Sequence, residues 1–104
     1  MSMGTKDVVI SRVTGLPTWG VAITARLDSG ASRSSIDQGF LKLLGLKREG
    51  EVTVRNANGR EVRDTVMVLV DDGDSLIELE VSLADRRRLT YPMILGRDYL
   101  EEEE

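Results

Sequence analysis

One carboxylate in this sequence stands where it could act chemically rather than as a surface charge. Asp28 ends an apolar run and is followed by Ser29, Gly30 and Ala31, which are a hydroxyl residue, a glycine and a small residue. A glycine lets the backbone turn tightly and approach a substrate, and neighbouring hydroxyl and amide groups can orient a carboxylate. The pattern is typical of a carboxylate held on a tight loop, although Asp-Ser-Gly also occurs in ordinary turns.

The residue types that are missing narrow the chemistry further. The 104-residue chain has no histidine and no cysteine. It therefore lacks a thiolate nucleophile, a Ser-His-Asp triad, a disulfide framework and the usual Cys/His zinc ligands. Any catalysis must use carboxylates, hydroxyls, lysine, arginine or backbone groups, and we predict neither a metal nor another cofactor.

The net charge of -4 has a local origin. The chain has 18 acidic and 14 basic residues, and four of the acids form the run at 101–104. The rest of the chain is balanced, and it has no basic stripe with interleaved aromatic residues, so we predict no nucleic-acid binding. No apolar stretch is typical of a membrane segment or a secretory signal, and we expect a cytoplasmic protein.

Short apolar runs separated by turn residues predict a mostly β domain. We expect one domain at 7–100, after a disordered or non-native start at 1–6 and before an acidic tail at 101–104, which is natural, engineered or similar to a substrate. Asp37 is the expected N-cap of a first helix and Gly45 its end. Strands are predicted at 8–13, 20–27, 51–56, 60–70, 75–83 and 91–94, and short helices at 37–45 and from Gly96 onwards.

Local patterns also predict two hairpins and one buried strand. Residues 15–20 contain glycines and a proline, which favour the first hairpin connection. The pair Asn58-Gly59 predicts a second hairpin, because a type I′ turn needs left-handed dihedrals that both residues tolerate. Its arms are polar, so it either projects as a plain surface hairpin or covers something. Residues 66–70 are all apolar and predict a strand buried on both faces.

A second motif far along the chain changes the interpretation of Asp28. The segment at 92–100 reads PMILGRDYL, in which apolar residues precede Gly-Arg-Asp. An Asp-Ser/Thr-Gly-Ala motif followed later by such a segment resembles the retropepsin-like aspartic peptidases. The resemblance implies a retropepsin-like closed β-barrel, the half of an acid protease, with a flap hairpin at 56–60 and one or two short helices.

The same resemblance implies a role for each motif residue. It makes Asp28 the catalytic aspartate, with Ser29 and Gly30 as its supporting loop. It also makes Gly96 and Arg97 the start of a helix that buttresses the loop.

The sequence resembles most closely the RimB-type branch of that family. The resemblance extends over LPTWG at 16–20, the loop at 28–31, IELEVSLADR at 77–86 and YPMILGR at 91–97. Members of this branch are frequently associated with RimK-type ATP-grasp enzymes, which add glutamates to protein C-termini. The resemblance implies a peptidase that trims α-linked polyglutamate tails, with a functional link to a RimK-type glutamate ligase. The branch is often labelled ATP-dependent zinc proteases, but a zinc site without histidine and cysteine would be unusual.

The sequence departs from the family pattern at three places. Ser29 replaces the commoner threonine, which is a conservative change. Ser32 and Arg33 stand where retropepsins often carry an acid that pairs with the Gly-Arg arginine, so the partner of Arg97 stays open. The chain also stops soon after Leu100, without the strand that many retropepsins use in their dimer interface, so the interface stays open too.

The chain holds a single Asp-Ser/Thr-Gly motif, whereas aspartic peptidases use two carboxylates that share one proton. One carboxylate deprotonates the attacking water, and the other hydrogen-bonds the scissile carbonyl. We therefore expect a C2 homodimer in which the second carboxylate is Asp28 of the partner subunit. The alternative is an inactive retropepsin-fold module that binds acidic peptides or mediates dimerisation.

An acidic or polyglutamylated substrate would need cations near the catalytic loop. Candidate substrate-binding residues lie in that loop, at the tip of the flap and in an arginine run: Ala31, Arg33, Asn58, Gly59, Arg60, Arg86, Arg87 and Arg88. Each arginine could equally be a solvated surface residue, since exposed charge is usual.

Overall fold

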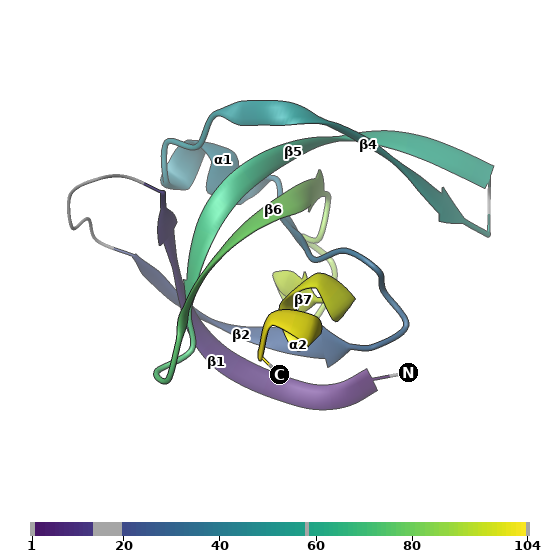
Figure 1. Cartoon of the computed structure of the whole chain (residues 1–104). Coiled ribbons are helices and arrows are strands. Elements are labelled where there is room, and N and C mark those ends of the chain that lie inside the picture. Colours follow the sequence, from purple (N-terminus) through teal and green to yellow (C-terminus); the bar gives the residue numbers. More distant parts are fainter. Residues whose placement is uncertain (1, 14–19, 58, 104) are drawn as a thin grey trace.

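The computed structural model describes residues 2–13, 20–57 and 59–103 of the chain. These residues form seven strands and two short helices, which confirms the predicted mostly β class (Figure 1). The strands are β1 (Ser2–Arg12), β2 (Val21–Asp28), β3 (Ser35–Asp37), β4 (Arg48–Asn56), β5 (Gly59–Asp71), β6 (Leu76–Ala84) and β7 (Met93–Leu95), and the helices are α1 (Gly39–Leu43) and α2 (Arg97–Glu103).

Most of the strands are joined in a ring. Their order in the sheet is β1-β2-β7-β3-β6-β5-β4, and β1 pairs with β5 as well. This additional pairing closes the sheet, while β4 extends from β5 outside the ring. The expected barrel is therefore a ring of paired strands, and the far end of the β4–β5 hairpin extends beyond it (Figure 1).

Two distant segments are brought together by the parallel pairing of β2 and β7. Leu27 of β2 pairs with Leu95 of β7. Asp28 directly follows Leu27, and Gly96 directly follows Leu95. Because parallel strands run in the same direction, the two motifs of the sequence emerge at the same edge of the sheet.

Aliphatic side chains from alternate strand positions form the core. Val66, Val68 and Val70 of β5 are fully buried, whereas Met67 and Leu69 between them are half-buried. The prediction that this strand is buried on both faces is therefore wrong. Successive side chains of a strand point to opposite faces, and the outer face of β5 is only partly covered.

Both expected ends of the domain take part in regular secondary structure. The start was expected to be disordered or non-native, but residues 2–6 are ordered and belong to β1, where Thr5 pairs with Arg26 and Lys6 with Ala25. The stabilising partner is β2, which a local pattern cannot indicate. At the other end, α2 includes residues 101–103 of the expected tail, since glutamate is a good helix former.

The first helix is shorter than predicted. Asp37, the expected N-cap, belongs to β3, and Gln38 occupies the N-cap position without a side-chain capping bond. Gly45 has a φ of 65°, a left-handed value that is common for glycine after a helix, as expected. β3 has three residues, too few for a periodic signal. Neither helix in the described part of the chain is long and apolar enough to cross a membrane.

Both predicted hairpins occur as antiparallel strand pairs. β1 pairs with β2, and residues 14–19 of their connection lie outside the described residues. In the β4–β5 hairpin, Asn56 pairs with Gly59, whose φ of 118° is also left-handed. Asn58 lies outside the described residues.

Tyr99 fixes α2 to the turn between β5 and β6. Its side chain is 1% exposed, and its hydroxyl donates a 2.6 Å hydrogen bond to Asp72 Oδ2. Lys6 Nζ lies 3.7 Å from the same oxygen. The helix that carries the second motif is thereby tied to the first strand and to the β5–β6 turn.

Replacing this hydroxyl tests the attachment. We expect Tyr99→Phe to lower the free energy of unfolding by about 1–3 kcal/mol, because a carboxylate shielded from water loses a donor. Urea denaturation measures the change. Tyr91→Phe is the matched control, since the Tyr91 hydroxyl makes no hydrogen bond within the described residues. Equal free energies for the two variants would contradict the role of Tyr99.

Candidate active site

Asp28 ends β2 and opens a tight loop, called here the Asp28 loop (residues 28–33). Gly30 N–H donates a 2.9 Å hydrogen bond to Asp28 Oδ1, and Ala31 N–H donates to the backbone carbonyl oxygen of Asp28 at 3.2 Å. Asp28 is half-buried, while Ser29 and Gly30 are exposed. The loop therefore orients the carboxylate with its own backbone and leaves it near the surface.

These contacts shift the acid-base behaviour of Asp28. The hydrogen bond from Gly30 lowers the pKa of Asp28 below its ordinary value of 3.8 and outweighs the opposing effect of burial. The positive charge of Arg26 acts weakly in the same direction as the hydrogen bond. The carboxylate is ionised at neutral pH, which is the state that accepts a proton from water.

The start of α2 lies directly behind the Asp28 loop. A Cβ atom on Gly96 would lie 2.6 Å from the carbonyl oxygen of Ala31 and 3.0 Å from the carbonyl carbon of Arg33. Arg97 N–H donates a 2.8 Å hydrogen bond to the same oxygen of Ala31. Only a residue without a side chain allows this approach, so the close packing of α2 on the loop depends on glycine at position 96.

Ser34 and Asp98 join the loop to the helix through their side chains. Ser34 Oγ donates a 2.6 Å hydrogen bond to Asp98 Oδ1 and accepts one of 3.0 Å from Gly96 N–H. The Ser34 N–H also points at the Asp98 carboxylate, 3.0 Å from Oδ2 and 3.1 Å from Oδ1. Ser34 is fully buried and Asp98 is half-buried, so the network is partly shielded from water.

The side chain that braces the loop is thus that of Asp98 rather than Arg97. Arg97 contributes its backbone N–H, but its side chain is exposed and has no ion-pair partner in the described part of the chain. The one feature of the sequence that could have indicated a role for Asp98 is that it is an acid in the first turn of the predicted helix. Nothing in the sequence links that acid to Ser34, which lies 64 residues away.

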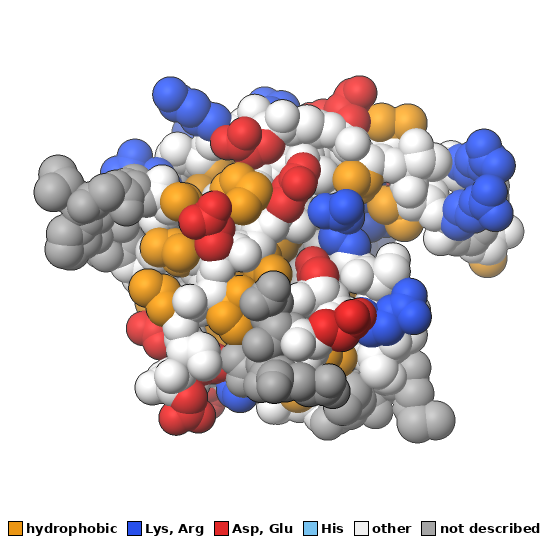
Figure 2. All heavy atoms as spheres, viewed as in Figure 1, with side chains coloured by type: hydrophobic (Ala, Val, Ile, Leu, Met, Phe, Trp, Pro, Cys, Tyr) orange, Lys and Arg blue, Asp and Glu red, His pale blue; other side chains and the backbone are white. Residues whose placement is uncertain are grey.

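A cavity of about 390 Å³ lies between the Asp28 loop and the β4–β5 hairpin. Gly30 and Ala31 line it on the loop side. The described residues around it include no acid but four arginines: Arg33, Arg55, Arg63 and Arg86. Figure 2 shows the hollow beneath the hairpin and the basic side chains gathered at its tip. The hairpin therefore covers a cationic cavity and is not a plain surface hairpin.

Two of these arginines, Arg55 and Arg63, were not among the predicted site residues. They lie on opposite arms of the hairpin, where Arg55 pairs with Arg60 and Arg63 with Val52. Which side chains face the cavity depends on this register and on the twist of the hairpin, so the sequence does not select them. Arg63 also contacts Glu61, with 3.1 Å between Nε and Oε1, which partly neutralises it.

The predicted residues of the flap lie elsewhere. Gly59 and Arg60 are exposed near the hairpin tip and are not among the residues that line the cavity, and Asn58 lies outside the described residues. Arg33 does line the cavity, and its guanidinium donates a 3.2 Å hydrogen bond to the carbonyl oxygen of Glu80.

The arginine run after β6 divides into three different environments. Arg86 is buried and lines the cavity. Arg87 is exposed and forms a 2.9 Å ion pair with Asp85, and Arg88 is exposed. Among the three, only Arg86 lines the cavity beside the Asp28 loop.

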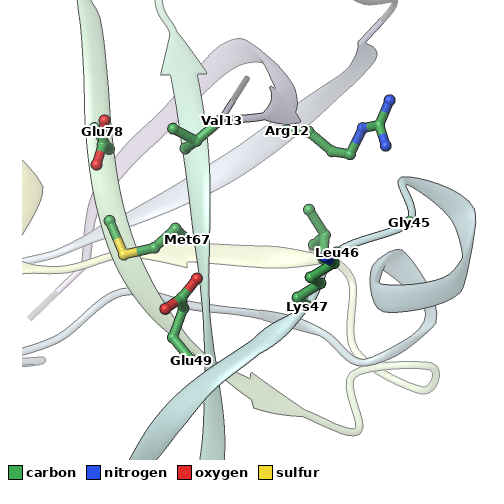
Figure 3. Close-up of a pocket in the computed structure, with 8 residues that line it drawn as sticks. All are labelled: Arg12, Val13, Gly45, Leu46, Lys47, Glu49, Met67 and Glu78. Atoms are coloured by element: carbon green, nitrogen blue, oxygen red, sulfur yellow. The ribbon is translucent and has the colours of Figure 1, made fainter. Parts of the chain in front are cut away.

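A larger cavity of about 620 Å³ lies outside this site, over the outer face of β5 (Figure 3). Its lining includes both signs of charge, with Arg12 and Lys47 against Glu49 and Glu78. It contains none of the predicted site residues. Within the described residues there is also no group of three or more His, Cys, Asp or Glu side chains placed to hold a metal ion.

No protein-family model and no curated protein match the chain. Among solved structures, EIAV protease in complex with the inhibitor HBY-793 has a TM-score of 0.72 at 21% identity, over 95% of this chain and 86% of that one. Simian Foamy Virus (mac) protease has a TM-score of 0.66 at 16% identity, over 93% and 91% of the two chains. Lpg0085, a protein of unknown function (DUF785) from Legionella pneumophila subsp. pneumophila str. Philadelphia 1, has a TM-score of 0.60 at 19% identity, over 95% and 84%.

At these identities the likeness concerns the fold. The two viral proteases superpose on nearly the whole of this mostly β chain, so the predicted retropepsin-like fold class is confirmed. The RimB-type branch remains a hypothesis.

The close approach of α2 to the loop gives a prediction for Gly96. We expect Gly96→Ala to lower the free energy of unfolding by about 1–3 kcal/mol, because the new methyl group would overlap backbone atoms that cannot move aside easily. Gly50→Ala is the control, since a Cβ there would meet its nearest atom at 3.6 Å, an ordinary contact. Thermal melts of both variants measure the difference, and a Gly96→Ala protein as stable as Gly50→Ala would count against the buttress.

Proposed function

We propose that the protein is an aspartic peptidase that works as a homodimer and hydrolyses acidic peptides. The observation that carries the proposal is an ionised carboxylate, Asp28, on a braced loop beside a cavity with four arginines and no acid among its described lining residues. A carboxylate can activate water, and arginines can bind the carboxylates of a peptide. The retropepsin-like fold supports the same chemistry.

The mechanism would use one Asp28 from each subunit. One carboxylate takes a proton from water as the water oxygen bonds to the scissile carbonyl carbon. The other, protonated, gives its proton to the carbonyl oxygen. The tetrahedral intermediate then collapses: one of its hydroxyls returns a proton to the pair as the C=O bond re-forms, the C–N bond breaks, and the amine leaves with the proton that was taken from water. In the alternative function, the protein is a binding module: the same cavity binds acidic peptides, but the peptides are not cleaved.

The finer substrate hypothesis is an α-linked polyglutamate tail. It depends on the resemblance of the sequence to the RimB-type branch, whose associated RimK-type ligases would make this substrate. The cavity supports it in one respect: consecutive glutamates carry several carboxylates, and several arginines surround the place where a peptide would lie.

Removing the charge of Asp28 tests the catalytic role. We expect Asp28→Asn to abolish cleavage while fold and dimer persist, since the amide has nearly the same shape but cannot accept the proton of water. Synthetic peptides that end in several α-linked glutamates, incubated with both proteins, would be analysed by mass spectrometry. The same peptides with glutamine in place of glutamate are the control for substrate charge.

Each outcome separates the candidates. Stepwise loss of glutamate with the wild type alone supports an acidic-peptide peptidase that uses Asp28. Wild-type turnover by Asp28→Asn would exclude the catalytic assignment. Binding of the glutamate peptides without cleavage by either protein would favour the binding module.

Dimer formation should depend on pH through the same residue. In one chain the Gly30 hydrogen bond holds the pKa of Asp28 below its ordinary value, so the free subunit is ionised at neutral pH. Two carboxylates about 3 Å apart cannot both ionise, so pairing raises one pKa and takes up a proton. We expect the dissociation constant of the dimer to fall between pH 7 and pH 5, by up to about tenfold per pH unit.

Sedimentation equilibrium over this pH range measures the effect. In Asp28→Asn the paired groups are neutral, so its dissociation constant should stay constant over the same range. A wild-type constant that does not change, or that rises in acid, would argue against paired Asp28 carboxylates.

A further inference from the structure

The cavity beside the Asp28 loop contains a buried cation without an acid to neutralise it. Arg86 is 8% exposed, and its Nε–H donates a 3.0 Å hydrogen bond to the carbonyl oxygen of Tyr91. No ion pair involves it within the described residues. Burial lowers the pKa of Arg86 from its ordinary value, and the charges of Arg26 and Arg63 act in the same direction, but arginine stays protonated. A cation in this environment favours binding of an anion.

Asp37 positions Arg86 without neutralising its guanidinium. Asp37 Oδ1 accepts the backbone N–H of Arg86 at 2.8 Å, and Oδ2 accepts the N–H of Gly39 at 3.0 Å. Both carboxylate oxygens are therefore engaged by backbone donors. The charge of Asp37 affects Arg86 less than burial and the neighbouring arginines do.

Ser35 contributes an unsatisfied hydroxyl to the same cavity. The residue is 6% exposed and lines the cavity, and its Oγ has no hydrogen-bond partner in the described part of the chain. Buried polar groups nearly always have a partner, so this hydroxyl calls for one. Ser35 and Asp37 lie two residues apart on β3, so their side chains share one face of the strand. The orphan hydroxyl is thus on the face that also anchors the backbone of Arg86.

We propose that Arg86 and Ser35 form a subsite that binds one side-chain carboxylate of an acidic peptide. The carboxylate accepts hydrogen bonds from the terminal nitrogens of Arg86 and from the Ser35 hydroxyl, so that both gain a partner. An uncharged amide would leave the Arg86 charge without a counter-ion. The subsite therefore selects glutamate over glutamine at one position of the substrate, and the inference rests on the proposed function because it assumes that the cavity receives a peptide.

Binding to Asp28→Asn tests the subsite without cleavage of the peptide. The probe is a peptide of four α-linked glutamates, acetylated at its N-terminus and amidated at its C-terminus, so that every carboxylate belongs to a side chain. In four further peptides, one glutamate at a time is replaced by glutamine. Isothermal titration calorimetry gives the affinity of each. We expect one replacement to weaken binding by about tenfold or more, the size of one charge-assisted contact.

Variants of Arg86 and Ser35, made in the Asp28→Asn protein, test whether the preference for glutamate over glutamine depends on the subsite. Arg86→Gln should reduce the glutamate preference at that position to below about threefold, and Ser35→Ala should reduce it by about three- to fivefold. Arg48→Gln is the matched control, because Arg48 is exposed, pairs with Asp64 and does not line the cavity. It should keep the preference.

Ser35→Ala keeps the test valid if Arg86→Gln does not fold. Without peptide, the loss of an unpaired buried hydroxyl should leave the melting temperature unchanged or raise it. Equal affinity for all five peptides overturns the subsite, and so does a glutamate preference that survives both variants. If the wild type cleaves the peptides but shows no glutamate preference, only the subsite is refuted. If the glutamate preference depends on Arg86 but the wild type cleaves no peptide, only the peptidase function is refuted.

Discussion

The candidate site depends on the partly buried hydrogen bonds between Ser34 and Asp98. A carboxylate that accepts hydrogen bonds from a hydroxyl and a backbone N–H makes stronger bonds than neutral groups do, and each broken bond would leave a donor of the fully buried Ser34 unsatisfied. The pair lies at the junction of the Asp28 loop and α2. The position of the Asp28 loop and the docking of the helix are therefore stabilised together, although the two segments are far apart in the sequence.

Tyr99, the residue after Asp98 in α2, adds a contact with a distant part of the fold. Asp98 binds the loop, and Tyr99 reaches Asp72 at the β5–β6 turn. One short helix thus ties the loop to the ring of strands, while Gly96 permits backbone contact at its start. A helix of seven residues would be marginal in water, so its stability comes from these contacts and from packing.

Charge is distributed unevenly over the molecule, because arginines gather around the cavity beside the Asp28 loop. Whereas acids and bases balance over most of the chain, the described lining of the cavity holds arginines and no acid. Arg33 and Arg63 already have partners in the chain, but the buried Arg86 has no counter-ion and the Ser35 hydroxyl has no partner among the described residues. Unsatisfied groups in one cavity favour an anionic ligand, and this electrostatic preference is independent of the family resemblance.

The sequence by itself determined the mostly β class and both hairpins, and it limits the chemistry that the candidate site could perform. Alternating aliphatic residues and turn residues act locally, and the lack of histidine and cysteine leaves Asp28 as the candidate group for activating water. It did not determine the role of Asp98, the inward position of Arg86 or the strand formed by residues 2–6. Only the tertiary structure decided these, because they depend on strand pairing and register between residues that are distant in the chain, and no local periodicity encodes such contacts.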